Sequence, residues 1–489
     1  MLVIVGFEKE LNMTITQEVA KESAKGEKQG HFERNLGLFD ATSIVAGSMI
    51  GSGIFIVSAD IGRQLNSAWL LLLVWLISAV VTTIAALCYA EYAASIPEAG
   101  GQYIYLKKVW GKRVGFLYGW CLFLVIQTGC IAAVSVAFAK FLGILLPDIV
   151  NNKVLFGAGP VHISAIEIIA ISLITFLTYI NSRGVQLGAI IQNVFTSTKL
   201  LALLGLILCG LFFGLDANAI HINFAVNPFN NQHFNLDFMT VLGVSMVGAL
   251  FSADSWNNVT FIASEIKQPE KNLPRALFLG VGGVCLLYFL INIMYLSVLD
   301  LPTLQHSQND IVAATFFDGI FGNSGKMVIS VIALISVFGC VNGTVMAGAR
   351  AFWAMAEDGL FFKRLAKIDP ETNVPTNALI AQGLWASLLV LSGSYSDLLN
   401  YITFVALLFY MFAIGGIYLF RHKYPNIERP YKTMFYPVLP AIYCLAAGFI
   451  ALSLLIKNPE NSLPGLLLLA AGVPVYYMKI NKTVLNQED

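Results

Sequence analysis

Apolar segments long enough to cross a lipid bilayer recur along this chain from residue 36 onward, and this pattern restricts the fold more than any other feature. A membrane-spanning helix needs about 20 consecutive, mainly apolar residues. Only 12% of the residues are charged and the mean hydropathy is +0.73, whereas a soluble globular protein is about 25% charged. The sequence therefore predicts an all-α integral membrane protein with about twelve transmembrane helices. The predicted spans are 36–62, 68–95, 114–146, 163–181, 186–214, 238–262, 273–299, 324–355, 375–393, 397–420, 436–456 and 463–480, with an interfacial helix at 101–111.

The two ends of the chain are predicted to be cytoplasmic tails, residues 1–35 and 481–489. The first tail has no sustained apolar run, and Met13 is an alternative start. Basic residues concentrate in alternate loops, and cytoplasmic loops are the ones enriched in Lys and Arg. This asymmetry predicts a multi-pass protein of the plasma (cell inner) membrane with both termini in the cytoplasm. The basic residues on the predicted cytoplasmic side are Lys107, Lys108, Lys112, Arg113, Lys267, Lys271, Arg275, Arg350, Lys363, Arg364, Lys367, Arg421, Lys423, Arg429 and Lys432.

Charge and motifs argue against several classes of function. The formal net charge is zero, so no basic field attracts nucleic acid. The seven cysteines lie in apolar segments without CxxC or Cys/His spacing, and we expect buried free thiols rather than metal ligands. The sequence contains no nucleophile-elbow, zinc-protease or phosphate-loop motif. We therefore expect no enzymatic activity, no cofactor and no metal.

The first predicted helix contains a segment that favours a break. GSMIGSGIF (Gly47–Phe55) places three glycines and two serines near the expected middle of the membrane. Glycine in a helix interior costs about 1 kcal/mol, and unwound backbone at this depth is tolerated only where it lines a protein-enclosed cavity. The alternative is a helix-packing face of small residues, because Gly47 and Gly51, like Ser48 and Ser52, are four residues apart.

The sixth predicted helix carries a second interruption, FSADSWNN (Phe251–Asn258), which includes the ionisable Asp254. Interrupted helices in corresponding positions of two halves indicate a transporter site. The pattern predicts two five-helix inverted repeats, 36–214 and 238–420, followed by two additional helices in 436–480. Half-helix N-termini would bind a carboxylate and half-helix C-termini an ammonium. These two groups together favour an α-amino acid as the ligand.

Lys199 lies in an otherwise apolar helix, FTSTKLLALLGLILCGLFFG. An ammonium at bilayer depth costs at least roughly 2.5–3.5 kcal/mol. Gln192 and Thr196 lie on the same helix face. We interpret Lys199 as a cation that handles protons or replaces a bound ion beside a substrate path; the alternative is a lysine that snorkels to the membrane surface. Glu91 is predicted near a helix end, where a charged side chain snorkels at little cost. Alternatively Glu91 and Arg350, both on the cytoplasmic side, form an inner gate.

Several segments together resemble a known family. They are GSMIGSGIF, SIPEAGGQYIYL (95–106), SWNNVTFIASEIKQPEKNLPRAL (255–277), NVFTSTKLLAL, FGCVNGTVMAGARAFWAMAEDG (338–359) and NVPTNALIA. Over residues 36–435 they resemble the amino acid–polyamine–organocation superfamily, and within it the L-type amino acid transporter group. The resemblance implies the leucine-transporter-type 5+5 inverted-repeat fold with discontinuous helices 1 and 6. It also implies sodium-independent amino acid transport, usually by obligatory exchange.

The resemblance further implies roles for individual residues. The implied substrate-binding residues are Met49, Ile50, Gly51, Ser52, Gly53, Phe251, Ser252 and Ser255. The stretch Ile50–Gly53 would meet the substrate carboxylate, and the carbonyl groups of Met49, Ile50, Phe251 and Ser252 would lie near its ammonium. Phe251 stands where the family places an aromatic lid, although core packing is an alternative, and Lys199 matches a lysine in the region where sodium-coupled relatives hold a cation. Further candidate pocket residues are Gln127, Thr128, Asp254, Asn342, Phe404 and Leu407.

The chain also departs from the family pattern. Leu407 replaces an aromatic residue of some members while Phe404 is retained, so large-neutral specificity is not implied. Ser255 replaces a usual glycine. Asn342 matches a polar residue near the fifth helix, and a helix–helix hydrogen bond is an equally good interpretation. The loop 147–162 lacks the cysteine that tethers eukaryotic members to a heavy subunit, so we expect a stand-alone protein without a disulfide-linked partner.

These observations predict a sodium-independent secondary transporter of amino acids. Among transport modes they favour exchange by alternating access. Proton-coupled import stays open, because a fifth-helix lysine fits both schemes. A channel or a transport-dead amino acid sensor on the same fold is the competing class. A membrane-embedded enzyme is disfavoured, because no catalytic constellation accompanies the helices.

Overall fold

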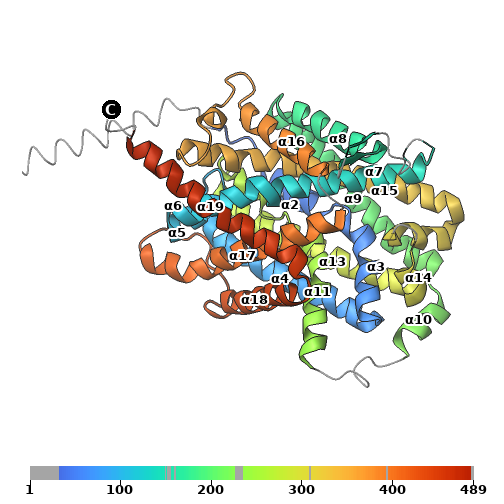
Figure 1. Ribbon diagram of the computed structural model, residues 1–489. Helices are drawn as coiled ribbons and strands as arrows, with labels where there is room; N and C mark the ends of the chain where they lie inside the picture. The colour runs from blue at the N-terminus through green and yellow to red at the C-terminus, as the bar shows by residue number, and fades with distance from the viewer. Residues whose placement is uncertain are drawn as a thin grey trace, which may run out of the picture.

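The chain folds into a bundle of helices (Figure 1), and the computed structural model describes residues 32–148, 150, 156–158, 161–225, 235–307, 310–391 and 395–485. In the first half of the chain the elements are α2 (Leu38–Met49), α3 (Gly53–Leu65), α4 (Ala68–Ser95), α5 (Gln102–Trp110), α6 (Lys112–Cys121), the π-helix η1 (Leu122–Ile126), α7 (Gln127–Leu145), β1 (Phe156–Ala158), β2 (Val161–Ile163), α8 (Ala165–Asn181), α9 (Val185–Cys209), the π-helix η2 (Gly210–Gly214) and α10 (Ala217–Phe224). In the second half they are α11 (Leu236–Ser252), α12 (Asn258–Phe261), the 3₁₀-helix η3 (Ala263–Glu265), α13 (Pro269–Val298), α14 (Leu301–Gln305), α15 (Val312–Glu357), the 3₁₀-helix η5 (Lys363–Ala366), α16 (Thr376–Val390), α17 (Tyr395–Lys423), α18 (Val438–Lys457) and α19 (Pro459–Leu485).

Each predicted span contains an α-helix, and α4 has the predicted bounds. By length and composition, eight helical segments of the described chain can cross a membrane, and four shorter apolar helices fill the remaining predicted spans. The shorter helices are Ala165–Asn181, Leu236–Ser252, Thr376–Val390 and Ser462–Met478. The prediction of an all-helical membrane protein is confirmed. The number of membrane crossings stays a prediction.

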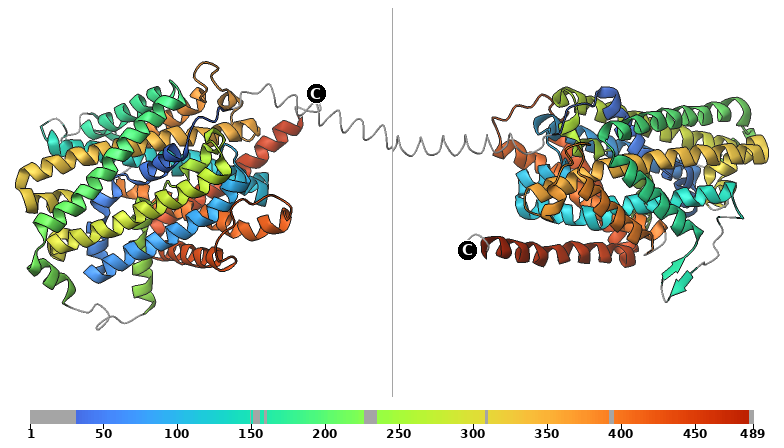
Figure 2. Two further views of the ribbon diagram at one scale, coloured as in Figure 1. Left: turned by 180° about the vertical axis from the view of Figure 1, so that it is seen from behind. Right: turned by 90° about the horizontal axis from the view of Figure 1, so that it is seen from above.

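Some elements were not predicted. An antiparallel hairpin of β1 and β2 lies where the loop 147–162 was expected, and it projects from the bundle (Figure 2). α15 begins at Val312 rather than at 324 and is kinked at Gly322, whose φ of 63° is a left-handed value that glycine adopts without a Cβ clash. α19 continues to Leu485, into the region predicted as a C-terminal tail.

The two halves of the first predicted helix occupy the centre of the bundle (Figure 1). α2 packs against α9, α13 and α15, while α3 packs against α11 and α14. α18 and α19 lie on one side, against α17. The fold therefore surrounds the break between α2 and α3 with protein, which is the condition for unwound backbone at membrane depth.

The clustered basic loops meet at one end of the bundle, which we call the basic end. Lys108 pairs with Glu98 at 2.5 Å, Lys107 pairs with Asp358 at 2.6 Å, and Lys423 donates to the carbonyl oxygen of Val109 at 2.8 Å. Loops that are far apart in sequence are thus joined at this end.

Glu91 and Arg350 do not pair with each other. The Glu91 side chain is fully buried and accepts hydrogen bonds from Arg421 Nη2 at 2.7 Å and from the Thr433 N–H at 2.8 Å. Arg350 pairs with Glu265 at 2.8 Å, and both side chains are buried. The prediction that Glu91 snorkels is wrong, because its side chain is buried and pairs with Arg421. Glu91 and Arg350 each find an opposite charge on a different distant segment, as a buried charge requires, and their part in an inner gate stays a prediction.

Candidate functional site

The first helix breaks where the glycine-rich segment predicted it. α2 ends at Met49, and Ile50 follows with an extended backbone (φ −76°, ψ 90°) before α3 begins at Gly53. The last carbonyl groups of α2 and the first N–H groups of α3 lack partners within their own helices. The negative end of one half-helix therefore meets the positive end of the other at a single buried point.

Neighbouring helices satisfy the carbonyl groups released by this break. Tyr288 of α13 donates its hydroxyl to Met49 O at 3.1 Å, and Ser336 Oγ of α15 donates to Ile50 O at 3.2 Å. Cys340 Sγ donates to Ser48 O at 2.9 Å. The carbonyl groups of Met49 and Ile50, which the resemblance assigns to the substrate ammonium, thus already accept hydrogen bonds from the protein.

Lys199 is fully buried and reaches the same break from α9. Its ammonium donates to Gly47 O at 2.5 Å, to Ile50 O at 2.8 Å and to Ser336 O at 3.3 Å. Three carbonyl oxygens around one cation compensate for part of its desolvation. The geometry is not that of a lysine whose ammonium reaches the membrane surface.

The sixth predicted helix breaks at the second interrupted segment. α11 ends at Ser252, and the chain passes through an irregular stretch before α12 begins at Asn258. Within this stretch Ser255 has φ 66°, a left-handed value that glycine adopts at less cost than other residues. The replacement of the family's glycine by Ser255 therefore falls at a position where the backbone favours glycine.

The two breaks lie against each other. A Cβ atom placed on Gly53 would lie 2.6 Å from Ser252 Cβ and 3.0 Å from Ser252 Cα, so a side chain there has no room. A Cβ on Gly51 would lie 3.0 Å from Cys340 Sγ. Gly53 thus serves close backbone packing between α3 and the end of α11.

Three small cavities, of about 30, 10 and 10 Å³, meet at Asp254. The first lies beside Phe251 and Leu407, and the second lies beside Gln127 and Ser255. The third lies directly between the two breaks and is lined by Ser48, Met49, Gly51, Ser52, Gly53, Cys130, Val134, Phe251, Ser252, Asp254, Ser255 and Cys340. A volume of about 10–15 Å³ holds one water molecule, so an amino acid enters only if side chains move.

Asp254 and Phe251 occupy the borders between these cavities. Asp254 accepts a hydrogen bond of 2.6 Å from the hydroxyl of Tyr410 of α17. Phe251 is buried and lines both the cavity between the breaks and the one beside Leu407. A ring in this position is able to separate two compartments or to join them by rotating.

The other candidate pocket residues divide into two groups. Gln127 and Leu407 line cavities, whereas Thr128 donates to Phe123 O at 2.6 Å within its own π-bulged helix. Phe404 is buried and lies near Gly465 of α19.

Asn342 forms helix–helix hydrogen bonds. It donates to Gln192 Oε1 at 3.0 Å and accepts from Asn181 at 2.9 Å. These contacts join α15 to α9 and α8, and they favour the second of the two interpretations given to Asn342.

Several residues of this region were not predicted from the sequence. Tyr288, Ser336 and Tyr410 each bond to a residue at one of the breaks, yet they are single polar groups in long apolar runs. Tyr410 follows Leu407 by three residues and thus shares its helix face, which is the one available signal. For Tyr288 and Ser336 only the packing of α13 and α15 on α2 shows the role.

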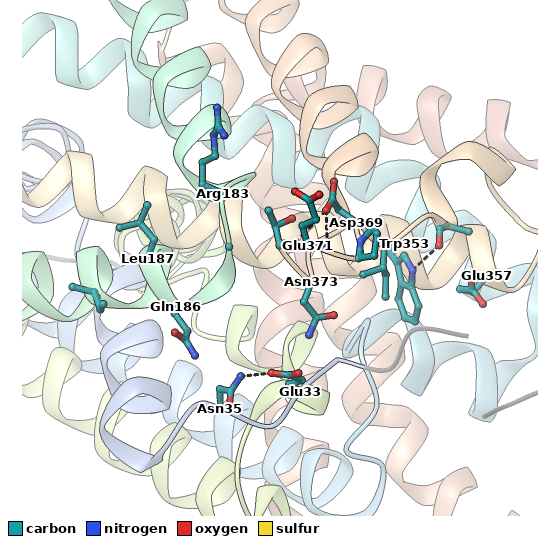
Figure 3. A pocket seen from close by; sticks show the side chains of 16 residues that line it. Glu33, Asn35, Arg183, Gln186, Leu187, Trp353, Glu357, Asp369, Glu371 and Asn373 are labelled. Carbon is teal, nitrogen blue, oxygen red and sulfur yellow. Dashed lines mark hydrogen bonds between the residues drawn. The ribbon is translucent and has the colours of Figure 1, made fainter. Parts of the chain in front are cut away.

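A cavity of about 860 Å³ lies at the basic end, away from the breaks (Figure 3). Its walls carry Glu33, Glu357, Asp369 and Glu371. The backbone N–H groups of Glu371 and Thr372 lower the pKa of Asp369, so this carboxylate is charged at neutral pH. Figure 3 shows the Arg183 side chain extending away from Glu33, and its guanidinium donates to Tyr179.

The two breaks together form a buried polar site. Helix C-terminal ends give it partial negative charge and helix N-terminal ends give it partial positive charge. Among the described residues, no group of three His, Cys, Asp or Glu side chains is arranged to hold a metal ion. The described helices thus provide polar backbone in an apolar surrounding, which is suited to binding a small zwitterion rather than to covalent chemistry.

Comparison with known proteins gives a consistent result. Residues 36–476 match the family described as Amino acid permease. The chain is 31% identical over 466 residues to "Large neutral amino acids transporter small subunit 2" of Mus musculus, covering 94% of this chain and 83% of that protein. It is 28% identical over 455 residues to "b(0,+)-type amino acid transporter 1" of Homo sapiens, covering 93% of this chain and 89% of that protein. The chain therefore belongs to the amino acid permease family and is an amino acid transporter, not an enzyme.

Proposed function

We propose that this protein is a sodium-independent amino acid exchanger that works by alternating access. Exchange is the obligatory swap of one substrate molecule for another across the membrane. The family membership establishes amino acid transport, and the proposal adds the ion requirement and the mode.

One observation carries the sodium independence. The Lys199 ammonium lies among the carbonyl oxygens of Gly47, Ile50 and Ser336. Carbonyl oxygens at an unwound helix are the ligands that coupling ions use in transporters of this kind. A covalently attached cation already supplies the charge at this point, so a bound sodium ion has neither room nor a role there.

The substrate head group is proposed to bind between the breaks. The N–H groups of Gly53 and Ile54, in the first turn of α3, would meet the carboxylate. The carbonyl end of α11, at Phe251 and Ser252, would meet the ammonium. We further propose that residues 36–214 and 238–420 form the inverted repeats, which places the two breaks at corresponding positions.

Location and assembly follow from the sequence argument. We propose a plasma-membrane protein with the basic end and both termini in the cytoplasm, because basic loops stay on that side. The mouse relative is named as a small subunit. We propose that the present chain works without a disulfide-linked heavy subunit, because its loop 147–162 contains no cysteine.

The test is counterflow in proteoliposomes. Vesicles that contain the purified protein are loaded with unlabelled amino acids, one at a time, and uptake of the same labelled amino acid is followed with and without a pH gradient. An exchanger shows saturable uptake that needs internal substrate and is indifferent to the gradient. Uptake into empty vesicles that follows an inward proton gradient would favour proton-coupled import, and uptake without counterflow would indicate a channel.

A further inference from the structure

Residues 32–36, which we call the strap, run between two cavities at the basic end and contain a tight turn, in which the Asn35 N–H donates to Glu33 O at 3.1 Å. Phe32 and Arg34 line a cavity of about 480 Å³, whereas Glu33 and Asn35 line the cavity of about 860 Å³. Successive side chains of the strap thus face opposite cavities. Figure 3 shows Glu33 and Asn35 along one wall of the larger cavity.

The two cavities have common walls besides the strap. Trp353 and Glu357, both near the end of α15, line both of them. The strap together with these side chains is therefore the partition between two spaces. Without the strap, the two spaces would join.

The strap is held at one end by backbone pairing. The Leu36 N–H donates to Glu265 O at 3.0 Å, and the Lys267 N–H donates to Leu36 O at 2.8 Å. These bonds make a parallel bridge between Leu36 and Ile266. The start of α2 is thus tied to the segment that follows the second broken helix.

Among the described residues, the side chain that holds the other end of the strap is Phe32. The Phe32 ring lies 4.9 Å from the Trp353 ring in an edge-on contact, and the Arg350 guanidinium lies 5.8 Å from the Phe32 ring. Arg350 in turn pairs with Glu265, the residue whose carbonyl group holds Leu36. Glu265 therefore connects both ends of the strap to α15.

We propose that the strap is a releasable partition between the two cavities of the basic end. Its release at Phe32 would join the two cavities beside the start of α2, whose far end lies at the Lys199 contacts. Among the described contacts, the Phe32 ring and the Leu36 backbone fix the strap, while the side chains of Glu33 and Arg34 are exposed. The Leu36 side chain is buried in the core, so the strap is anchored at that end and opens at the Phe32 end.

The test is thiol accessibility behind the strap. Ser264 lines the smaller cavity next to Phe32, and its hydroxyl oxygen is buried without a hydrogen-bond partner among the described groups. A Ser264→Cys protein should react slowly with a maleimide, and the parent protein gives the background of its native cysteines. Phe32→Ala should raise the labelling rate about tenfold, which corresponds to ~1.4 kcal/mol easier opening.

Two further variants, both made in the Ser264→Cys protein, keep this test decisive. Phe39→Ala, which removes an exposed ring from the first turn of α2, should leave the labelling rate unchanged. Phe32→Leu, which keeps apolar bulk if the Ala variant does not fold, should give an intermediate rate. Equal labelling rates with Phe32 intact, with Phe32→Leu and with Phe32→Ala would overturn the strap. An equal rise in the Phe39→Ala variant would overturn it as well.

The role of the strap in transport rests on the proposed exchange, but the labelling does not. If exchange is gated here, adding substrate to the Ser264→Cys protein should raise the labelling rate, and Phe32→Ala should abolish this response. Labelling that follows the strap variants in a protein without counterflow would sustain the partition and reject the exchanger. If counterflow is present but the labelling rate changes neither with substrate nor with the strap variants, the exchanger is sustained and the partition is rejected.

Discussion

The Lys199 ammonium lies 2.8 Å from the carbonyl oxygen of Ile50, the residue at which the first membrane helix stops. A buried cation and the free end of a helix thus compensate each other, as the helix dipole favours. Neither partner would be stable at this depth alone, because unpaired polar groups in an apolar surrounding are costly.

Replacing Lys199 by Ala should remove a donor from the carbonyl groups of Gly47 and Ile50, of which, among the described contacts, only Ile50 O keeps a second donor, the Ser336 hydroxyl. Each unpartnered buried group costs roughly 1–3 kcal/mol, and we expect exchange to fall at least about tenfold, or ~1.4 kcal/mol in the barrier. Counterflow rates in proteoliposomes check this. Lys112→Ala, at an exposed position, serves as the control. An Lys199→Ala protein as active as the control would contradict the assigned role.

Gly53 should not tolerate a side chain. A Cβ atom there would lie 2.6 Å from Ser252 Cβ, so Gly53→Val should abolish substrate binding while the protein is still expressed. Ligand-induced thermal stabilisation measures the binding. Gly283→Ala is the matched control, because a Cβ at Gly283 meets nothing within 4 Å. An unchanged affinity of the Gly53→Val protein would show that binding does not need the close contact between Gly53 and Ser252.

Phe251 should matter for the transport cycle more than for affinity. It lies between two of the cavities at Asp254, where closing over a ligand requires a flat apolar group. Phe251→Ala should slow counterflow more than it weakens binding, and Phe251→Trp or Phe251→Tyr should restore much of the rate. The comparison needs a binding isotherm and a rate for each variant. Equal rates for Ala and Phe would leave Phe251 as core packing only.

The Arg350–Glu265 pair should be sensitive to the loss of one partner. Arg350→Met leaves the buried Glu265 carboxylate alone, which typically costs about 3–5 kcal/mol. Thermal unfolding in detergent should show this loss, and adding Glu265→Gln should recover most of it. The exposed pair of Arg63 and Asp310 is the control, since surface pairs contribute about 0–1 kcal/mol. A small effect of Arg350→Met would mean that water reaches the carboxylate.

The positions of the helices were largely predictable because apolar length dominates the signal. Residues 68–95 read as one apolar run and form α4 with those bounds. The breaks were predictable for a similar local reason, since Gly47–Gly53 and Ala253–Asn257 contain residues that disfavour a helix. The resemblance also put Lys199 in the region where sodium-coupled relatives hold a cation, and its ammonium lies at the first break.

Pairings between distant segments were not predictable. Glu91 meets Arg421, 330 positions further along the chain, and nothing local in either segment indicates the other. The hydroxyl of Tyr288 meets Met49 O only because α13 packs on α2. The strap was likewise hidden, since Phe32 reads as one aromatic residue in a polar tail until the fold brings Trp353 to it.

The dependence of counterflow on sodium tests the central claim most directly. Vesicles loaded with an amino acid that the protein exchanges are assayed for labelled uptake in sodium chloride and in choline chloride at equal ionic strength. The account predicts the same saturable rate in both salts, since Lys199 supplies the cation at the first break. A rate that rises with sodium concentration and saturates would contradict it, because a bound sodium ion would then be part of the transport cycle.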